Sequence, residues 1–159
     1  MFPTYNYTFQ NYLYFSNIKI LYLRYFDGIT HEGTYDLLKF VNLEKLTLFF
    51  NRRAQIKISE INIKFSNLTY LKIINNKLNF ILTIILKDQH KLKYLKLNGV
   101  CFDTLRTCTS LRTLKLYNTD TNKIQIKYFN DLRYFKSEGI KNVELVNMTN
   151  LIICDIQNP

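Results

Sequence analysis

Four lysines recur along the sequence at intervals of 24, 19 and 21 residues, namely Lys72, Lys96, Lys115 and Lys136. Three of them follow a tyrosine by two positions. Ammonium groups bind carboxylates and phosphates, and tyrosine adds apolar area and a hydroxyl, so these residue types are typical of binding sites. The formal net charge of +10 also favours an acidic partner, a phosphate backbone or an anionic membrane surface.

The histidines and cysteines form no catalytic or metal-binding pattern. His31 and His90 are 59 positions apart and cannot form a local pair of bases or ligands. Cys101, Cys108 and Cys154 include no Cys-x-x-Cys pair, so we expect reduced and mostly buried thiols. The sequence also lacks a glycine-rich phosphate loop and a nucleophile elbow. We therefore predict a protein that is not an enzyme and that uses no metal and no cofactor.

The length and composition indicate one folded domain. The chain has 159 residues, of which 47% are hydrophobic and 21% charged, with only four glycines and two prolines. The N-terminus has no basic start followed by an apolar run, which predicts an intracellular protein, in the cytoplasm of a host cell if the source is viral. The most apolar stretch, residues 78–86, is far shorter than the roughly 20 residues that span a bilayer, so we expect no membrane span.

An internal repeat is the main structural signal. The pattern apolar-x-x-apolar-x-apolar occurs seven times, and 18 of its 21 framework positions are Leu or Ile while only Ser137 is polar. The copies begin at Ile18, Leu43, Leu68, Leu92, Leu111, Leu132 and Leu151. Such a short unit buries its apolar side only by stacking on its neighbours, so the repeat predicts a solenoid.

This pattern resembles the leucine-rich repeat family over residues 18–159, with Asn51 and Asn76 at the position where that family places Asn or Cys. The resemblance implies an α/β fold: a right-handed solenoid of about seven repeats, with a curved parallel sheet on its concave side. Short helices, 3-10 turns or extended segments would form the convex side. Residues 1–17 would be an N-terminal cap or a degenerate repeat, and we expect no C-terminal cap after the last copy.

The segments between the copies should differ along the array. Residues 34–41 and 80–87 have apolar residues at helical spacing, which predicts short helices. The copy that begins at Leu92 is shorter, so residues 102–108 can hold little more than a turn. Residues 56–63 and 124–126 alternate between apolar and polar, which favours extended structure.

Known leucine-rich repeat proteins mostly bind ligands on the concave sheet, and the third, fifth and seventh positions of each copy should line it. The lysines occupy the fifth position of four consecutive copies, so their ammonium groups should stand about 4.8 Å apart. We predict a binding surface made by Lys72, Lys96, Lys115, Lys136, Tyr70, Tyr94, Tyr134, Tyr117, Tyr22, Arg24 and Phe49.

We expect this surface to bind a protein partner that carries acidic groups. One alternative is a nucleic acid or another polyanion, with bases stacked on Tyr70, Tyr94 and Tyr134. Another is that AT-rich codons supply lysine and tyrosine to any solvated face. A third is that the chain is an uncapped fragment of a larger repeat protein with no function of its own. The last strand, residues 151–156, should also leave an open edge through which the chain could self-associate.

Overall fold

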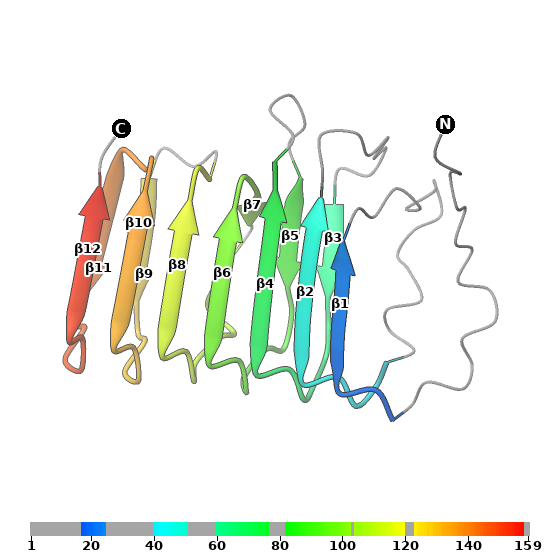
Figure 1. Ribbon diagram of the computed structural model, residues 1–159. Coiled ribbons are helices and arrows are strands. Elements are labelled where there is room, and N and C mark those ends of the chain that lie inside the picture. The colour runs from blue at the N-terminus through cyan, green and yellow to red at the C-terminus, as the bar shows by residue number, and fades with distance from the viewer. Residues whose placement is uncertain are drawn as a thin grey trace.

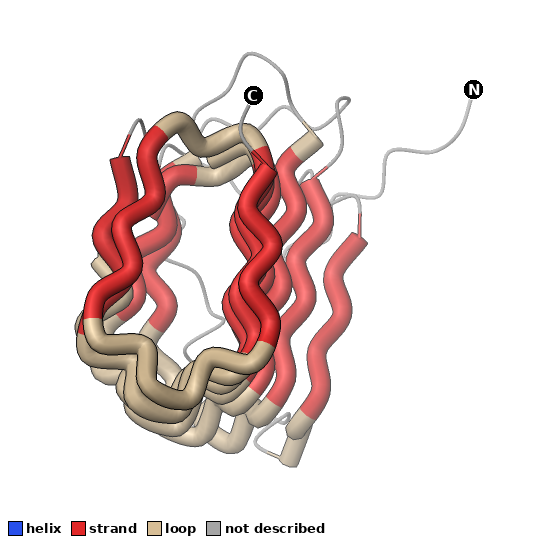
Figure 2. The backbone as a smooth tube through the Cα atoms, turned by 90° about the vertical axis from the view of Figure 1, so that its left-hand side faces the viewer, coloured by secondary structure: helices blue, strands red, loops and turns tan. Residues whose placement is uncertain are grey.

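The protein is a parallel β-solenoid in the computed structural model, which describes residues 17–24, 40–50, 60–76, 82–102, 104–119 and 123–157. Every strand pair in it is parallel. Figure 1 shows the strands of the main sheet side by side, and Figure 2, turned by 90°, shows two walls of strands joined by loops around the core.

The first wall is a single seven-stranded sheet. Its strands, in spatial order, are β1 (Ile20–Arg24), β2 (Lys45–Phe50), β4 (Tyr70–Asn75), β6 (Tyr94–Asn98), β8 (Thr113–Tyr117), β10 (Tyr134–Glu138) and β12 (Ile153–Gln157). Each strand begins two residues after the predicted start of a copy. The repeat therefore predicted the position and the order of every strand in this sheet.

The second wall consists of two smaller sheets. One contains β3 (Glu60–Ile63), β5 (Thr83–Leu86) and β7 (Cys101–Phe102), and the other contains β9 (Lys123–Lys127) and β11 (Asn142–Val146). The wall divides between β7 and β9, next to the first of the shorter copies. The extended structure predicted for residues 124–126 is confirmed by β9, and that predicted for 56–63 is confirmed for the described residues 60–63.

The α/β class is wrong for the described residues, because none of them is helical. Thr83–Leu86, within the helix expected over 80–87, forms β5 instead. Its residues Thr83, Ile84 and Ile85 are β-branched, and its neighbours β3 and β7 supply backbone partners that an isolated segment lacks. The other expected helix, residues 34–41, lies almost entirely outside the described residues, as do residues 1–16 of the expected N-terminal cap.

The number of complete turns is also lower than expected. Second-wall strands are described after β2, β4, β6, β8 and β10, so about five turns have both walls rather than seven. The turn predicted within residues 102–108 is present at Arg106 and Thr107, after the two-residue strand β7.

The hydrophobic core is built from the framework positions of the repeat. All fifteen framework residues of the five copies that begin at positions 43 to 132 are buried, because each layer is covered by a layer on either side. The first copy is half-buried, and in the last copy Cys154 and Ile156 are exposed. The expectation of mostly buried cysteines is therefore wrong for Cys154 and correct for Cys108. Beyond β12, no described strand covers this last layer.

Residues in the left-handed backbone region form the corners after the main strands. Gly99 (φ 64°), Asn118 (φ 47°) and Gly139 (φ 76°) occupy the same place in successive copies. The amide of each donates to a carbonyl of the following main strand, at 2.9–3.0 Å. The buried Asn75, at the equivalent position, donates from Nδ2 to the Gly99 carbonyl at 2.9 Å, whereas Asn76, the residue at the family's consensus position, is exposed.

Ser137 carries a buried hydroxyl in the core. It is 0% exposed, and its Oγ has no hydrogen-bond partner among the described residues. Burying an unpaired hydroxyl costs free energy that an apolar side chain of similar size avoids. Ser137→Ala is therefore expected to raise the free energy of unfolding by roughly 1 kcal/mol.

Urea unfolding followed by circular dichroism would measure this change as a higher midpoint at an unchanged slope. Thr107→Ala is a suitable control, because the Thr107 hydroxyl donates to the Leu86 carbonyl at 3.1 Å and its loss should lower the midpoint. A lower midpoint for Ser137→Ala would mean that the Ser137 hydroxyl has a partner in solution.

Candidate functional site

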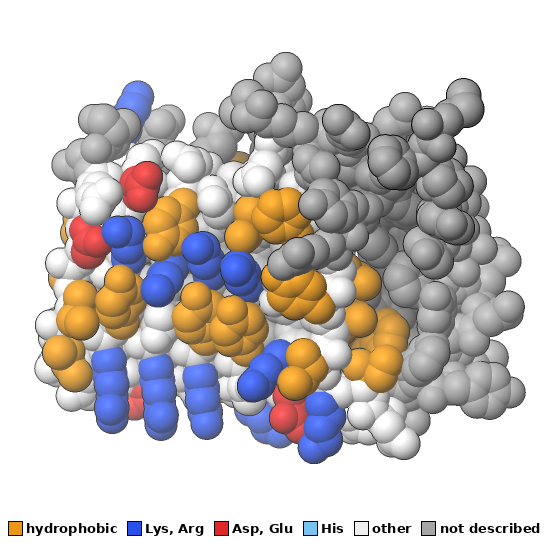
Figure 3. All heavy atoms as spheres, in the orientation of Figure 1, with side chains coloured by type: hydrophobic (Ala, Val, Ile, Leu, Met, Phe, Trp, Pro, Cys, Tyr) orange, Lys and Arg blue, Asp and Glu red, His pale blue; other side chains and the backbone are white. Residues whose placement is uncertain are grey.

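The four predicted lysines stand in one row across the outer face of the seven-stranded sheet. The strand register pairs Lys72 with Lys96, Lys96 with Lys115, and Lys115 with Lys136. We call this set the lysine row. Figure 3 shows a row of basic side chains across the middle of the described face, with apolar side chains on both sides. At a strand spacing of about 4.8 Å, neighbouring ammonium groups repel each other by a little under 1 kcal/mol in water.

The row ends at an acidic residue. Register places Asp155 beside Lys136, and Lys136 Nζ lies 2.6 Å from Asp155 Oδ2. Hydrogen bonding to Asp155 raises the pKa of Lys136, and hydrogen bonding to Lys136 lowers the pKa of Asp155. The pKa of Lys96 is lowered instead, mainly by partial burial and then by the charges of Lys72 and Lys115. Among the described residues, no carboxylate forms an ion pair with these three lysines.

The tyrosines beside the lysine row contact one another and the lysines. The rings of Tyr70 and Tyr94 stack, with centroids 4.4 Å apart and planes 5° from parallel. Lys96 Nζ lies 4.7 Å from the centroid of Tyr117, and Lys115 Nζ lies 4.8 Å from the centroid of Tyr134. These are cation–π distances. Burial, and to a lesser extent the neighbouring Tyr70, raise the pKa of Tyr94 to about 12, so its hydroxyl keeps its proton.

The three remaining predicted residues lie on β1 and β2, outside the strands that carry the lysine row. Tyr22 is exposed on β1, in the same register row but two strands before Lys72. Phe49 on β2 is half-buried, at the seventh position of its copy. The backbone of Arg24 ends β1, and its side chain lies outside the described residues. The centre of the predicted surface is therefore on β4, β6, β8 and β10.

A second basic row was missed by the sequence prediction. Lys93, Arg112 and Arg133 each directly precede a main strand, and all three are exposed. The Arg112 amide donates to the Lys93 carbonyl at 2.8 Å, and the Arg133 amide to the Arg112 carbonyl at 3.0 Å, so the three residues follow one another across the sheet. Figure 3 shows basic side chains in a lower row, below a band of apolar side chains. The signal in the sequence is a basic residue at the second position of these three consecutive copies.

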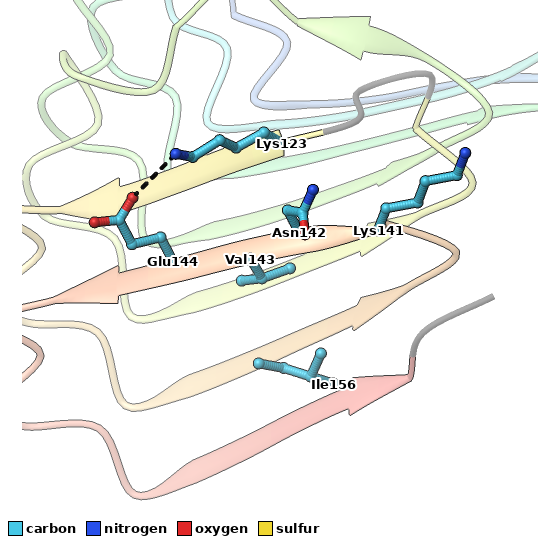
Figure 4. A pocket seen from close by; sticks show the side chains of 6 residues that line it. All are labelled: Lys123, Lys141, Asn142, Val143, Glu144 and Ile156. Carbon is cyan, nitrogen blue, oxygen red and sulfur yellow. Dashed lines mark ion pairs between the residues drawn. The ribbon is translucent and has the colours of Figure 1, made fainter.

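The end of the solenoid at β12 forms a second surface. A hollow of about 540 Å³ is lined by Lys123, Lys141, Asn142, Val143, Glu144 and Ile156. Figure 4 shows that most of these residues come from β9, β11 and β12, with Lys123 directed at Glu144, 3.7 Å away. Ile153 and Ile156 on β12 are 50% and 40% exposed. Self-association through this edge stays a prediction, and these exposed isoleucines are the residues that it would cover.

The described residues contain no cluster of three His, Cys, Asp or Glu side chains that could hold a metal ion. His90 is exposed between β5 and β6, while His31 lies outside the described residues. Within the part of the chain that the structure covers, no helix is long and apolar enough to cross a membrane.

No protein-family model matches this sequence, and neither the curated proteins nor the solved structures include a significant match. The function is therefore inferred from the geometry of the basic face alone.

Proposed function

We propose that this chain is a leucine-rich-repeat-like solenoid, without enzymatic activity, that binds an acidic protein partner on the outer face of its seven-stranded sheet. The observation that carries the proposal is the lysine row, in which three ammonium groups stand in register without a carboxylate among the described residues. Mutual repulsion in this row costs stability, and an acidic ligand relieves it.

The surrounding residues support a protein ligand. Tyrosine gives a large contact area with few conformations to restrict, and tyrosine and arginine are both enriched in protein interfaces. The aliphatic stems of the lysines add apolar area beside them. The lysine row extends across β4, β6, β8 and β10, and the second basic row across the last three of these strands, so that a polypeptide segment laid across the strands meets both charge and apolar area.

A nucleic acid is a weaker candidate for this face. The alternative relied on bases stacking on Tyr70, Tyr94 and Tyr134. However, Tyr70 and Tyr94 already stack on each other. A run of bases stacked on all three rings would have to separate this pair, whereas carboxylates can bind the ammonium groups without moving the rings.

The experiment is a binding titration with poly-L-glutamate, followed by fluorescence anisotropy at several salt concentrations. The triple variant Lys72→Glu, Lys96→Glu and Lys115→Glu is expected to bind at least about tenfold more weakly than the native chain. A control variant with Lys64, Lys87 and Lys141 changed to Glu has the same net charge but alters exposed lysines beside the second wall. It should retain most of the binding.

Equal losses in both variants would contradict the proposal, because binding would then depend on net charge alone. Tighter binding of an oligothymidylate than of poly-L-glutamate, with a steep dependence on salt, would favour the nucleic acid instead. If the native chain binds neither polymer, the lysine row is a solvated face.

A further inference from the structure

Thr113 interrupts a row of tyrosines on the outer face of the main sheet. The third position of consecutive copies holds Tyr70, Tyr94, Thr113 and Tyr134, and the strand register aligns them side by side. Threonine has no ring, so β8 carries a small, partly exposed side chain between two aromatic neighbours. We call this place the Thr113 gap.

We infer from the usual strand spacing that the Thr113 gap has the width of one aromatic ring. Tyr70 and Tyr94, on adjacent strands, show that two rings separated by one strand step stack face to face at 4.4 Å. Tyr94 and Tyr134 are two strand steps apart, or about 9.6 Å at the usual strand spacing. A ring placed midway would lie about 4.8 Å from each of them, within the range of 4.5–7 Å that aromatic pairs prefer.

Both tyrosines turn a ring face toward this gap. Tyr94 lies flat against Tyr70 on one side, so its opposite face is directed toward β8. Tyr134 has Lys115 Nζ above its ring at 4.8 Å, and Lys115 belongs to β8. The Lys115 ammonium therefore occupies one side of the gap, and an entering ring would displace it toward solvent, where it can bind an anion.

Cations border the gap along β8. Arg112 directly precedes Thr113, and Lys115 follows it by two positions. The faces of tyrosine rings are electron-rich and favour a neutral ring over an anion between them, whereas Arg112 and Lys115 favour carboxylates at its two ends. The chemistry that fits is an aromatic side chain with acidic residues before and after it.

We propose that the Thr113 gap receives one aromatic side chain of an acidic polypeptide partner, whose neighbouring carboxylates bind Arg112 and Lys115. This inference rests on the proposed function and names the anchor residue of the partner. A polypeptide fits better than a polynucleotide because the face offers one such gap within the described residues, while a polynucleotide presents a base at every unit.

The experiment compares two labelled peptides, one with a phenylalanine flanked on each side by three glutamates and one with alanine in place of the phenylalanine. The native chain is expected to bind the phenylalanine peptide about tenfold more tightly. Thr113→Tyr fills the gap and should remove this preference. Thr113→Ser keeps the gap open and should retain the preference.

Tyr134→Ser is a second variant, which removes one wall instead of filling the gap and should also reduce the preference. Circular dichroism checks that each variant is folded. If both peptides bind the native chain equally, the gap is not an anchor although the proposed function stands. If neither peptide binds the native chain at low salt, this proposal and the proposed function are both overturned. A preference that persists in Thr113→Tyr and Tyr134→Ser, or an oligothymidylate whose binding Thr113→Tyr abolishes, also overturns the proposal.

Discussion

Phe135→Ala is expected to lower the free energy of unfolding by about 3–5 kcal/mol, the largest effect of any substitution considered for this chain. Phe135 is 0% exposed and is among the largest fully buried side chains. It occupies a framework position that is leucine in the five preceding copies. The next inward position on the same strand is Ser137, so a large and a small residue share a layer where β8 has Leu114 and Leu116.

We infer that Phe135 and Ser137 compensate each other in volume, because side chains two positions apart lie on the same face of a strand and interiors are closely packed. A double-mutant cycle in urea tests this. Ser137→Leu alone should destabilise the protein by about 1–3 kcal/mol through overpacking, and Phe135→Leu alone should leave a cavity. The double variant should be more stable than the sum of the single effects predicts, and strict additivity would contradict the inference.

Gly99→Ala is expected to be the next most damaging substitution, with a loss of roughly 2–4 kcal/mol. Gly99 has φ +64°, and an added Cβ would lie 2.1 Å from the backbone oxygen of Asn75. This oxygen belongs to the preceding copy, so the methyl group would force two neighbouring turns apart. The same displacement would strain the hydrogen bond from Asn75 Nδ2 to the Gly99 carbonyl.

Gly139→Ala provides the matched control. Its φ of +76° carries a similar conformational penalty, but the nearest atom to an added Cβ is the side-chain Oδ1 of Asn118, at 3.0 Å. A side chain can move where a backbone carbonyl cannot, so a loss of only about 1 kcal/mol is expected. Thermal and urea unfolding of both variants would measure the difference, and equal losses would mean that backbone conformation, not the close approach, explains the requirement for glycine at position 99.

The main sheet was predictable because its signal is repeated. Leucine or isoleucine occupies 18 of the 21 framework positions, so the register survives exceptions such as Ser137. The segments that form the second wall have no such repeated pattern. The copies of the repeat range from 19 to 25 residues in length, so these segments also differ in length. Thr83–Leu86 fits a helical spacing over a short window, and only the neighbouring strands decide in favour of β structure.

The candidate site was predictable in part for the same reason. Periodicity placed the lysine row in register, and the strand pairing confirms that alignment. Periodicity could not show that Lys96 lies over Tyr117 or that Tyr70 stacks on Tyr94, because these contacts depend on side-chain conformations. The second basic row, Lys93, Arg112 and Arg133, was not predicted. These residues precede the strands, where the alternation of apolar and polar residues does not indicate which way a side chain points.

Each main strand pairs only with the main strands of the adjacent copies, which makes the solenoid a nearly one-dimensional system. In such an array local opening starts at the ends and travels inward, so β6, with three strands on either side, opens last. A ligand bound across β4 to β10 would link these turns to one another, because unfolding could not proceed inward through one of them without breaking contacts to the ligand. Its binding free energy would thus be shared by several turns, and occupancy would make the array more cooperative.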